Sequence, residues 1–384
     1  MTGSAFDGIN EEGFFDRVSD IFSKQAPDLS QTLNIAVVGK VSSGKSSLIN
    51  ALLKLSRKQA IDVAKVGAVS GVTQALTILK LDERVCLIDS PGLDDVKAEN
   101  SEVTKQFLSH IDIGIFVVTG SSDASQKSNL EQLKQCCDQL FVVLNKADEW
   151  DELAPSVLEN VIAQWKKHLD VSKIYATCTK GYDPQSLSPK MDIRGVAQLR
   201  SDIEKVLEKK GKDLLLARHM AKKRSYAIKI ISVALVAVAG AAIVPGSAVW
   251  IAAAQGVAIA SLYYLYRGEI LSNEAALAIL PTFVAKSAGT SLFLFVTSFL
   301  PPTGIVDAAA VMVAVAITMA MLAAINHLLA SGSELAETEL LQSTFMTYQK
   351  GANKAAKDIV SNVRDTDRVK DIIVSFLDGH YSPI

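Results

Sequence analysis

Charge is nearly absent from residues 230–332 of this 384-residue chain, which hold only five charged side chains. The other 281 residues hold 75 of the 80 charged side chains, so the overall figure of 21% charged averages two different compositions. A hydrophobic content of 49% with a formal net charge of −2 excludes a disordered chain. The same balance does not favour a dedicated nucleic-acid binder, which would be basic. The five charged residues of the poor stretch, residues 230–332, are Arg267, Glu269, Glu274, Lys286 and Asp307.

Cysteine is scarce as well. The chain has four, Cys86, Cys136, Cys137 and Cys178, and none forms a CxxC pair. This pattern disfavours a disulfide framework or a structural zinc site and favours a reducing compartment. The five histidines are scattered in sequence, and we expect none of them to hold a metal. The first fifteen residues lack a basic segment followed by an apolar run, so we expect no signal peptide.

Composition and hydrophobic period divide the chain into four expected parts. Residues 1–30 hold an amphipathic helix, residues 31–212 an α/β domain, residues 213–332 a basic linker helix and a hydrophobic helical domain, and residues 333–384 amphipathic helices. The first helix, over residues 10–25, would dock on the domain that follows it, or contact a partner or a membrane. Its apolar face is formed by Phe14, Phe15, Val18, Ile21 and Phe22.

Short apolar runs alternate with longer amphipathic stretches in the second part. This alternation predicts a mostly parallel sheet with helices on both faces. The expected strands cover residues 35–39, 85–89, 113–118 and 141–145, and the expected helices lie near residues 45–55, 98–109, 126–137, 153–169 and 195–209.

The first expected strand leads into a glycine-containing loop that matches GxxxxGK[ST], Gly39 to Ser46, and a helical pattern follows. Such a loop wraps a phosphate with backbone N–H groups at a helix N-terminus. We expect Lys45 to reach the β- and γ-phosphates and the Ser46 hydroxyl to bind Mg²⁺. The nucleotide contacts expected from this segment are Gly39, Lys40, Val41, Ser42, Ser43, Gly44, Lys45, Ser46 and Ser47.

Two further motifs follow in the order that nucleotide binding requires. Asp89-Ser-Pro-Gly92 ends a strand and would place a carboxylate beside the metal and a glycine near the γ-phosphate. Asn145-Lys146-Ala-Asp148 ends a later strand. The Asp148 carboxylate can accept two hydrogen bonds from guanine, a pair that adenine cannot donate, and a buried carboxylate left unpaired is costly. Asn145 would join the base loop to the phosphate loop, and the stem of Lys146 would cover the base.

These motifs resemble the G1, G3 and G4 motifs of the P-loop GTPases, over about residues 32–210. The resemblance implies binding of GTP or GDP with Mg²⁺, and slow hydrolysis of GTP to GDP and phosphate without a partner or self-assembly. It also implies a G2 threonine, for which Thr73 is preferred over Ser70 and Thr77. Ser46, Thr73 and Asp89 would then hold the metal, with Lys45, Thr73 and Gly92 acting on the γ-phosphate. A fifth motif falls on Thr177-Cys178-Thr179, followed by Lys180-Gly181, and Cys178 departs from the usual alanine.

The details are similar to the Era/TrmE-like branch, with a dynamin-like character in the phosphate loop. Leu93 stands where Ras-like enzymes carry the glutamine that orients the attacking water. Hydrolysis would therefore need a switch backbone, a monovalent cation or a partner chain. Ser42 occupies the position of the asparagine found in potassium-dependent relatives, and it could help to hold such a cation.

The low-charge stretch is expected to form two helical hairpins with Pro/Gly turns. Segments of about 20 apolar residues are long enough to span a bilayer core. Lys222, Lys223 and Arg224 precede the first segment, which predicts that both ends of the hairpins face the cytoplasm. Lys286 and Asp307 would be costly in lipid, so an alanine-rich soluble bundle remains the alternative. The four segments lie near residues 227–244, 247–266, 275–300 and 304–330.

Over about residues 225–335 this pattern resembles the YcjF-like hydrophobic domain of unknown function, which implies membrane association. The leading hypothesis is a membrane-associated GTP-dependent switch with its nucleotide domain in the cytoplasm. It would contact membrane lipid, or form a homodimer through either domain. One alternative is a dynamin-like or immunity-GTPase-like membrane remodeller, and another is a soluble GTPase of ribosome or tRNA assembly. A binding switch with negligible hydrolysis is also open.

Overall fold

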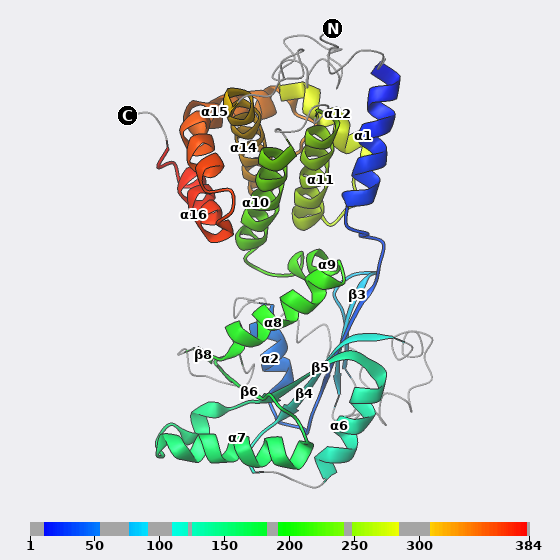
Figure 1. The fold of residues 1–384 in the computed structure, drawn as a ribbon. Helices are drawn as coiled ribbons and strands as arrows, with labels where there is room; N and C mark the ends of the chain where they lie inside the picture. The colour runs from blue at the N-terminus through cyan, green and yellow to red at the C-terminus, as the bar shows by residue number, and fades with distance from the viewer. Residues whose placement is uncertain are drawn as a thin grey trace. The chain divides into compact units, whose positions relative to one another are not determined.

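The chain forms two compact units, which a computed structural model describes over residues 11–53, 77–90, 110–121, 125–182, 191–241, 248–283 and 308–381 (Figure 1). The sheet unit is Asp28–Lys222, and the helical unit combines Met1–Pro27 with Lys223–Ile384. Several residues singled out from the sequence lie outside the described residues: Ser70, Thr73, Gly92, Leu93, Lys286, Asp307 and both Pro/Gly turns.

The sheet unit is built on a six-stranded sheet in the order β2-β3-β1-β4-β5-β6. β2 pairs antiparallel with β3, and every other neighbouring pair is parallel, which confirms the predicted fold class. All eight residues of β4 are buried, so this strand reads in sequence as one continuous apolar run. The strands are β1 (Leu33–Val38), β2 (Thr77–Lys80), β3 (Val85–Ser90), β4 (Ile111–Val118), β5 (Cys137–Leu144) and β6 (Tyr175–Ala176).

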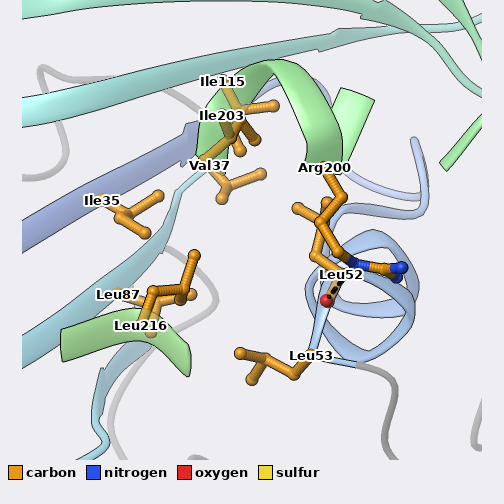
Figure 2. A pocket seen from close by; sticks show the side chains of 9 residues that line it. All are labelled: Ile35, Val37, Leu52, Leu53, Leu87, Ile115, Arg200, Ile203 and Leu216. Carbon is orange, nitrogen blue, oxygen red and sulfur yellow. Dashed lines mark hydrogen bonds between the residues drawn. The ribbon is translucent and has the colours of Figure 1, made fainter. Parts of the chain in front are cut away.

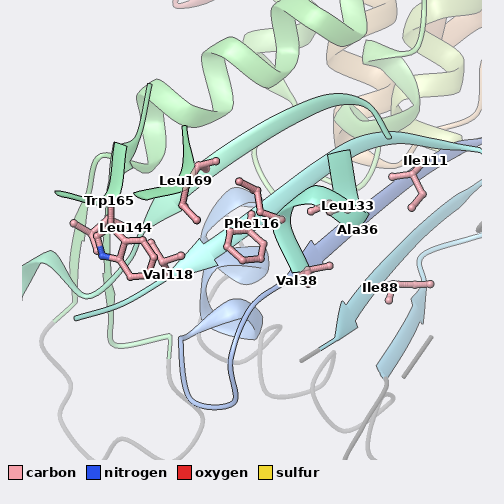
Figure 3. Packing of buried hydrophobic residues seen from close by; sticks show 12 residues of the cluster. Ala36, Val38, Ile88, Ile111, Phe116, Val118, Leu133, Leu144, Trp165 and Leu169 are labelled. Carbon is pink, nitrogen blue, oxygen red and sulfur yellow. The ribbon is translucent and has the colours of Figure 1, made fainter. Parts of the chain in front are cut away.

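Helices cover both faces of this sheet, because successive strand residues point to opposite sides. Val38, Phe116 and Val118 face a core that includes Leu133 and Trp165 of α6 (Ser125–Cys136) and α7 (Pro155–Leu169) (Figure 3). On the other side, Val37 and Ile115 meet α2 (Lys45–Leu52), α8 (Val196–Lys209) and α9 (Asp213–Ala217). The helices predicted near 45–55, 126–137, 153–169 and 195–209 are confirmed, and the one near 98–109 lies outside the described residues.

The most apolar helices of the helical unit occupy its centre. Most of the described side chains of α11 (Ala248–Arg267) and α14 (Ala308–Ser331) are buried. Between them, Gln255 donates to the hydroxyl of Thr318 at 2.7 Å, and both side chains are fully buried. Their neighbours include α1 (Glu11–Gln25), α10 (Arg224–Ala241), α12 (Asn273–Ile279) and α15 (Thr338–Ser361), and α16 (Thr366–Leu377) packs on α10 and α15.

Two expectations for the helical parts are wrong. α1 packs its apolar face on α11 and α12 of its own unit, and does not dock on the domain that follows it in sequence. Phe22 can reach α11 because Gly256 has no side chain: a Cβ there would lie 3.1 Å from the Phe22 ring. The helix expected over 275–300 already ends at Ile279, and a 3₁₀ turn, η2 (Leu280–Phe283), follows. Pro281 lies in that turn, and proline cannot donate the next α-helical hydrogen bond.

A carboxylate in the β2–β3 turn holds the segment that follows α9. Asp82 Oδ2 lies 3.0 Å from His219 Nε2 and 3.4 Å from Arg218 Nε. Its Oδ1 accepts hydrogen bonds from the amides of Arg84 and Val85. Burial alone would raise the pKa of Asp82, but these two amides, His219 and Arg218 outweigh it and leave the pKa below its usual value.

Replacing this carboxylate should change how the stability of the sheet unit depends on pH. A carboxyl group whose pKa is lower in the folded than in the unfolded chain stabilises the fold above the unfolded value of about 3.9, and this contribution is lost as the pH falls through the folded value. We therefore expect Asp82→Asn to lower the free energy of unfolding at pH 7 and to have little effect near pH 2. Urea unfolding across this range measures the difference, and a pH-independent difference would contradict the assignment.

Candidate nucleotide site

The loop between β1 and α2 is shaped around two glycines. Gly44, the N-cap of α2, has φ 83°, a left-handed conformation that disfavours other residues. A Cβ on Gly39 would lie 2.2 Å from the carbonyl oxygen of Val117, so only glycine allows the loop to approach the end of β4 this closely. The loop therefore lies at the carboxyl edge of the parallel strands, where open α/β sheets bind ligands.

Replacing Gly39, the glycine that lies against the end of β4, should disrupt the fold of the loop. The obstruction at Gly39 is a backbone carbonyl, which cannot rotate away, so we expect Gly39→Ala to lower the free energy of unfolding by more than about 2 kcal/mol. The matched control is Gly240→Ala in α10, where a Cβ meets nothing within 4 Å. That change should be neutral or slightly stabilising, because alanine favours a helix. Thermal unfolding of both variants tests the pair.

Polar groups of the loop point to an anionic ligand. Lys45 is only 8% exposed, and its ammonium donates to the carbonyl of Lys40 at 3.1 Å across the loop. The Ser43 hydroxyl is buried and has no hydrogen-bond partner among the described residues. Buried polar groups are normally paired, and a phosphate would supply acceptors to the hydroxyl and to the ammonium. Lys40, Val41, Ser42 and Ser46 are exposed, and Ser47 is partly buried.

A single buried amide joins the phosphate loop to the loop after β5. Asn145 Nδ2 donates to the Ser43 carbonyl at 3.0 Å and lies 3.4 Å from the Gly44 carbonyl. Its Oδ1 accepts from the Thr177 hydroxyl at 3.0 Å. The hydroxyl of Thr179, the third residue of the expected fifth motif, lies 3.3 Å from both Nδ2 and Oδ1 of the same amide. The structure thus brings the predicted Asn145, Gly44 and Thr177 together, as expected.

The carboxylate predicted to recognise guanine is held by the strand after Thr177. Cys178 donates its thiol to Asp148 Oδ1 at 3.3 Å, and Lys180 Nζ lies 3.6 Å from Oδ2. Burial raises the pKa of the Cys178 thiol to about 11, so the thiol keeps its proton at neutral pH and acts as the donor. The side chain of Cys178 therefore orients Asp148, whereas its contact with the nucleotide stays a prediction.

The backbone around these residues fixes the loop that carries them. Lys146 has φ 60°, and the 3₁₀ helix η1 (Ala147–Trp150) follows at once. The amide of Ala147 donates to the Thr177 carbonyl at 2.9 Å. Asp148 is 22% exposed, so it remains accessible to a ligand while it is held on one side.

The strand register carries the predicted metal ligands to the same edge. Asp89 pairs with Val37 at the end of β3, so its backbone lies beside the strand that enters the phosphate loop. Hydroxyl and carboxylate oxygens, as in Ser46 and Asp89, are ligands that suit Mg²⁺. Thr73 and Gly92 lie outside the described residues, so the complete set of metal ligands stays a prediction.

A second cluster of polar groups occupies the opposite edge of the sheet. His110 Nε2 lies 3.2 Å from Asp112 Oδ1 and 3.4 Å from Asp138 Oδ2, a proximity that their sequence spacing did not indicate. The ammonium of Lys212 lies 2.6 Å from Asp112, and Lys210 pairs with Asp138. Because two lysines already balance the two carboxylates, this cluster is an ion-pair network rather than a metal site.

Comparison with known proteins agrees with this geometry. Residues 34–146 match the family model described as 50S ribosome-binding GTPase. The sheet unit carries a P-loop GTPase domain of the TrmE/Era-like type. A GTPase Der of Nitratiruptor is 29% identical over 165 residues, which are 40% of this chain and 34% of that protein. A GTPase Era of Thermoanaerobacter is 28% identical over 156 residues, 39% of this chain and 50% of that protein. The chain thus spans half or less of the length of these two relatives.

Solved structures match the GTPase domain weakly. The elongation factor SelB of Methanococcus maripaludis in complex with a GTP analogue covers 46% of this chain with a TM-score of 0.31 and 18% identity. The match spans 34% of the SelB chain. The FeoB G-domain of Methanococcus jannaschii is covered over 99% of its length with a TM-score of 0.26 and 16% identity.

Proposed function

We propose that this chain binds GTP and GDP with Mg²⁺ and hydrolyses GTP. The observation that supports this proposal best is the junction at Asn145, where one buried amide joins the phosphate loop to the loop of Asp148. Phosphate and base recognition are thereby held in one geometry. The two relatives named above are GTPases, and the GTPase family model matches residues 34–146, which supports the assignment of the reaction.

Preference for guanine follows from the carboxylate. Asp148 offers two acceptor oxygens, and guanine presents the N1–H and N2–H donors that match them. An adenine base presents no such pair, so the carboxylate would lose water without gaining hydrogen bonds from the base, and discrimination should be strong. Hydrolysis is expected to be slow in the isolated chain, because Leu93 cannot orient a water as a glutamine does.

The test is a titration of the full chain with fluorescent GDP, GTP, ADP and ATP in the presence of Mg²⁺, followed by a phosphate-release assay. We expect GDP and GTP to bind at least 100-fold more tightly than the adenine nucleotides. Equal affinity for ATP would overturn the base assignment. If the chain binds GTP but releases no phosphate, even at high protein concentration, the proposed hydrolysis is wrong and the chain is a binding switch.

Membrane association is the second proposal, and the outer face of α10 supports it. Three helices are long and apolar enough to cross a membrane: Arg224–Ala241, Ala248–Arg267 and Ala310–Ser331. The apolar windows of the last two are 78% and 72% buried inside the helical unit, whereas that of α10 is only 50% buried. Val233 is 62% exposed, and no charged residue follows it in α10. The part of this face after Lys229 could lie against lipid without separating the bundle.

Flotation of the full chain with anionic liposomes tests this contact. We expect the wild type to float and Val233→Glu to float much less, because a carboxylate on the lipid-facing side would be costly. The matched control is Met346→Glu on the amphipathic helix α15, which is similarly exposed at 58% and should leave flotation unchanged. Flotation of neither the wild type nor the control would favour the soluble bundle.

Two further functions would be favoured by other results with the full chain. Turnover that rises with protein concentration on liposomes would favour the dynamin-like remodeller and a homodimer. The matched family is described by ribosome binding, so GTP-dependent co-sedimentation of the full chain with ribosomal particles would favour the assembly GTPase instead.

A further inference from the structure

The C-terminal end of the phosphate-loop helix is held by an arginine from far along the chain. Arg200 of α8 donates from Nε to the carbonyl of Leu52 at 2.8 Å (Figure 2). Its Nη2 donates to the carbonyl of Ala51 at 2.5 Å. The residue is only 9% exposed, so water does not readily replace these bonds. The two carbonyls belong to the last turn of α2, which begins at Lys45 in the phosphate loop.

These bonds suit the needs of a helix terminus. The last four carbonyls of an α-helix have no donor within the helix, and they form the negative end of its dipole. The Arg200 guanidinium satisfies two of them and places a positive charge at that end. A third bond continues the attachment, because the Leu53 carbonyl accepts from the amide of Ala221 at 3.2 Å.

Apolar packing alone does not fix this end of the helix. Leu52, Leu53 and Arg200 border a cavity of about 20 Å³, together with Ile203 of α8 and Leu216 of α9 (Figure 2). A gap of this kind deprives its lining of some packing contacts. Leu53 is still buried, so the directional hydrogen bonds of Arg200 act together with apolar packing to hold the last turn of α2.

α2 is thus attached at both ends by residues distant in sequence. Its N-terminal end is held by Asn145 through the Ser43 carbonyl, and its C-terminal end by Arg200. Eight residues of α-helix are about 12 Å long, so a tilt at one end moves the other. An error of about 1 Å at a reactive group can cost two orders of magnitude in function.

We propose that Arg200 is a positioning residue for nucleotide binding: by holding the last turn of α2, it aims the Lys45 end of the helix at the phosphates. This inference rests on the proposed nucleotide binding. Arg200 itself lies at the far end of the helix and touches no nucleotide. Its removal should weaken the binding of GDP, chiefly through faster dissociation, without changing the preference for guanine.

The test compares Arg200→Met and Arg200→Lys with the wild-type full chain. We expect Arg200→Met to bind fluorescent GDP about ten-fold more weakly. Arg200→Lys keeps the charge and one donor, so it should recover part of this loss. Leu133→Ala is the control, because it removes core packing on the opposite face of the sheet without touching α2. Amide hydrogen exchange in the nucleotide-free proteins should be faster in α2 of Arg200→Met than in α2 of the control.

Each outcome either supports or overturns the positioning role of Arg200. Weaker GDP binding with faster exchange in α2, at a melting temperature no lower than that of Leu133→Ala, supports the positioning role. Unchanged binding in a folded Arg200→Met overturns it, and so does a loss of affinity equal to that of the control. If Arg200→Met does not fold, Arg200→Lys with wild-type affinity and wild-type exchange in α2 overturns it, and a partial loss supports it. Failure of the wild type itself to bind GDP would overturn the proposed function, whereas the exchange in α2 would still report whether Arg200 holds the helix.

Discussion

Lys45→Ala is expected to lower the affinity for GDP and GTP by at least about 100-fold. Lys45 is 8% exposed, and its ammonium spans the loop to the carbonyl of Lys40, so it is already placed inside the cradle that the phosphates would occupy. Charge-assisted hydrogen bonds in a partly dry site are stronger than those in water, and a phosphate supplies both the charge and the acceptors. Titration with fluorescent nucleotide measures the loss.

The matched control lies on the same loop. Lys40→Ala removes an equal charge from an exposed side chain and leaves the carbonyl that Lys45 contacts in place. We expect this variant to bind within a few-fold of the wild type, because an exposed charge is screened by solvent. If both variants lose nucleotide affinity by the same factor, binding depends on the general positive charge of the loop, and Lys45 is not the phosphate ligand.

Asp148→Asn is expected to exchange the base preference from guanine to xanthine. The wild-type carboxylate accepts from N1–H and N2–H of guanine. Asparagine offers one acceptor and one donor, and this pair matches N1–H and the O2 carbonyl of xanthine. We expect the affinity for GDP to fall by about 100-fold and that for xanthosine diphosphate to rise by a similar factor.

Competition between the two diphosphates measures the exchange in one experiment. The adjacent Glu149→Gln is the control, since it makes the same kind of change at a side chain that is 52% exposed. It should leave both affinities unaltered. A loss of GDP binding in Asp148→Asn without any gain for xanthosine diphosphate would indicate that the loop is disturbed, since Cys178 and Lys180 also contact Asp148.

Local patterns in the sequence were enough to predict the sheet and the loops at its carboxyl edge. Buried strands such as β4 appear in the sequence as continuous apolar runs. The loop from Gly39 to Ser46 lies between a strand and a helix, the position in which its motif can bind a phosphate. The junction at Asn145 was also predictable, because two loops at the ends of parallel strands meet at one edge. Thr179 shares this junction, but its role depends on the path of the strand after β6.

Contacts between distant segments left no such pattern. Arg200 reads in the sequence as one basic residue of an amphipathic helix, and only the fold brings its guanidinium to the carbonyls of Ala51 and Leu52. The position of α1 was missed for a related reason. Its apolar face showed that it must be covered, but the complementary surface around Gly256 lies more than 200 residues further along.

This place of α1 has a consequence for biosynthesis. α1 is synthesised before the sheet unit, and Gly256, which receives Phe22, follows only after the whole sheet unit has been made. At about 5–20 residues per second, roughly 12 to 47 seconds separate the synthesis of Phe22 from that of Gly256. The sheet unit can fold during that delay, whereas the helical unit cannot be completed until α11 has been made. Until then, the apolar face of α1 lacks the surface that covers it in the folded unit.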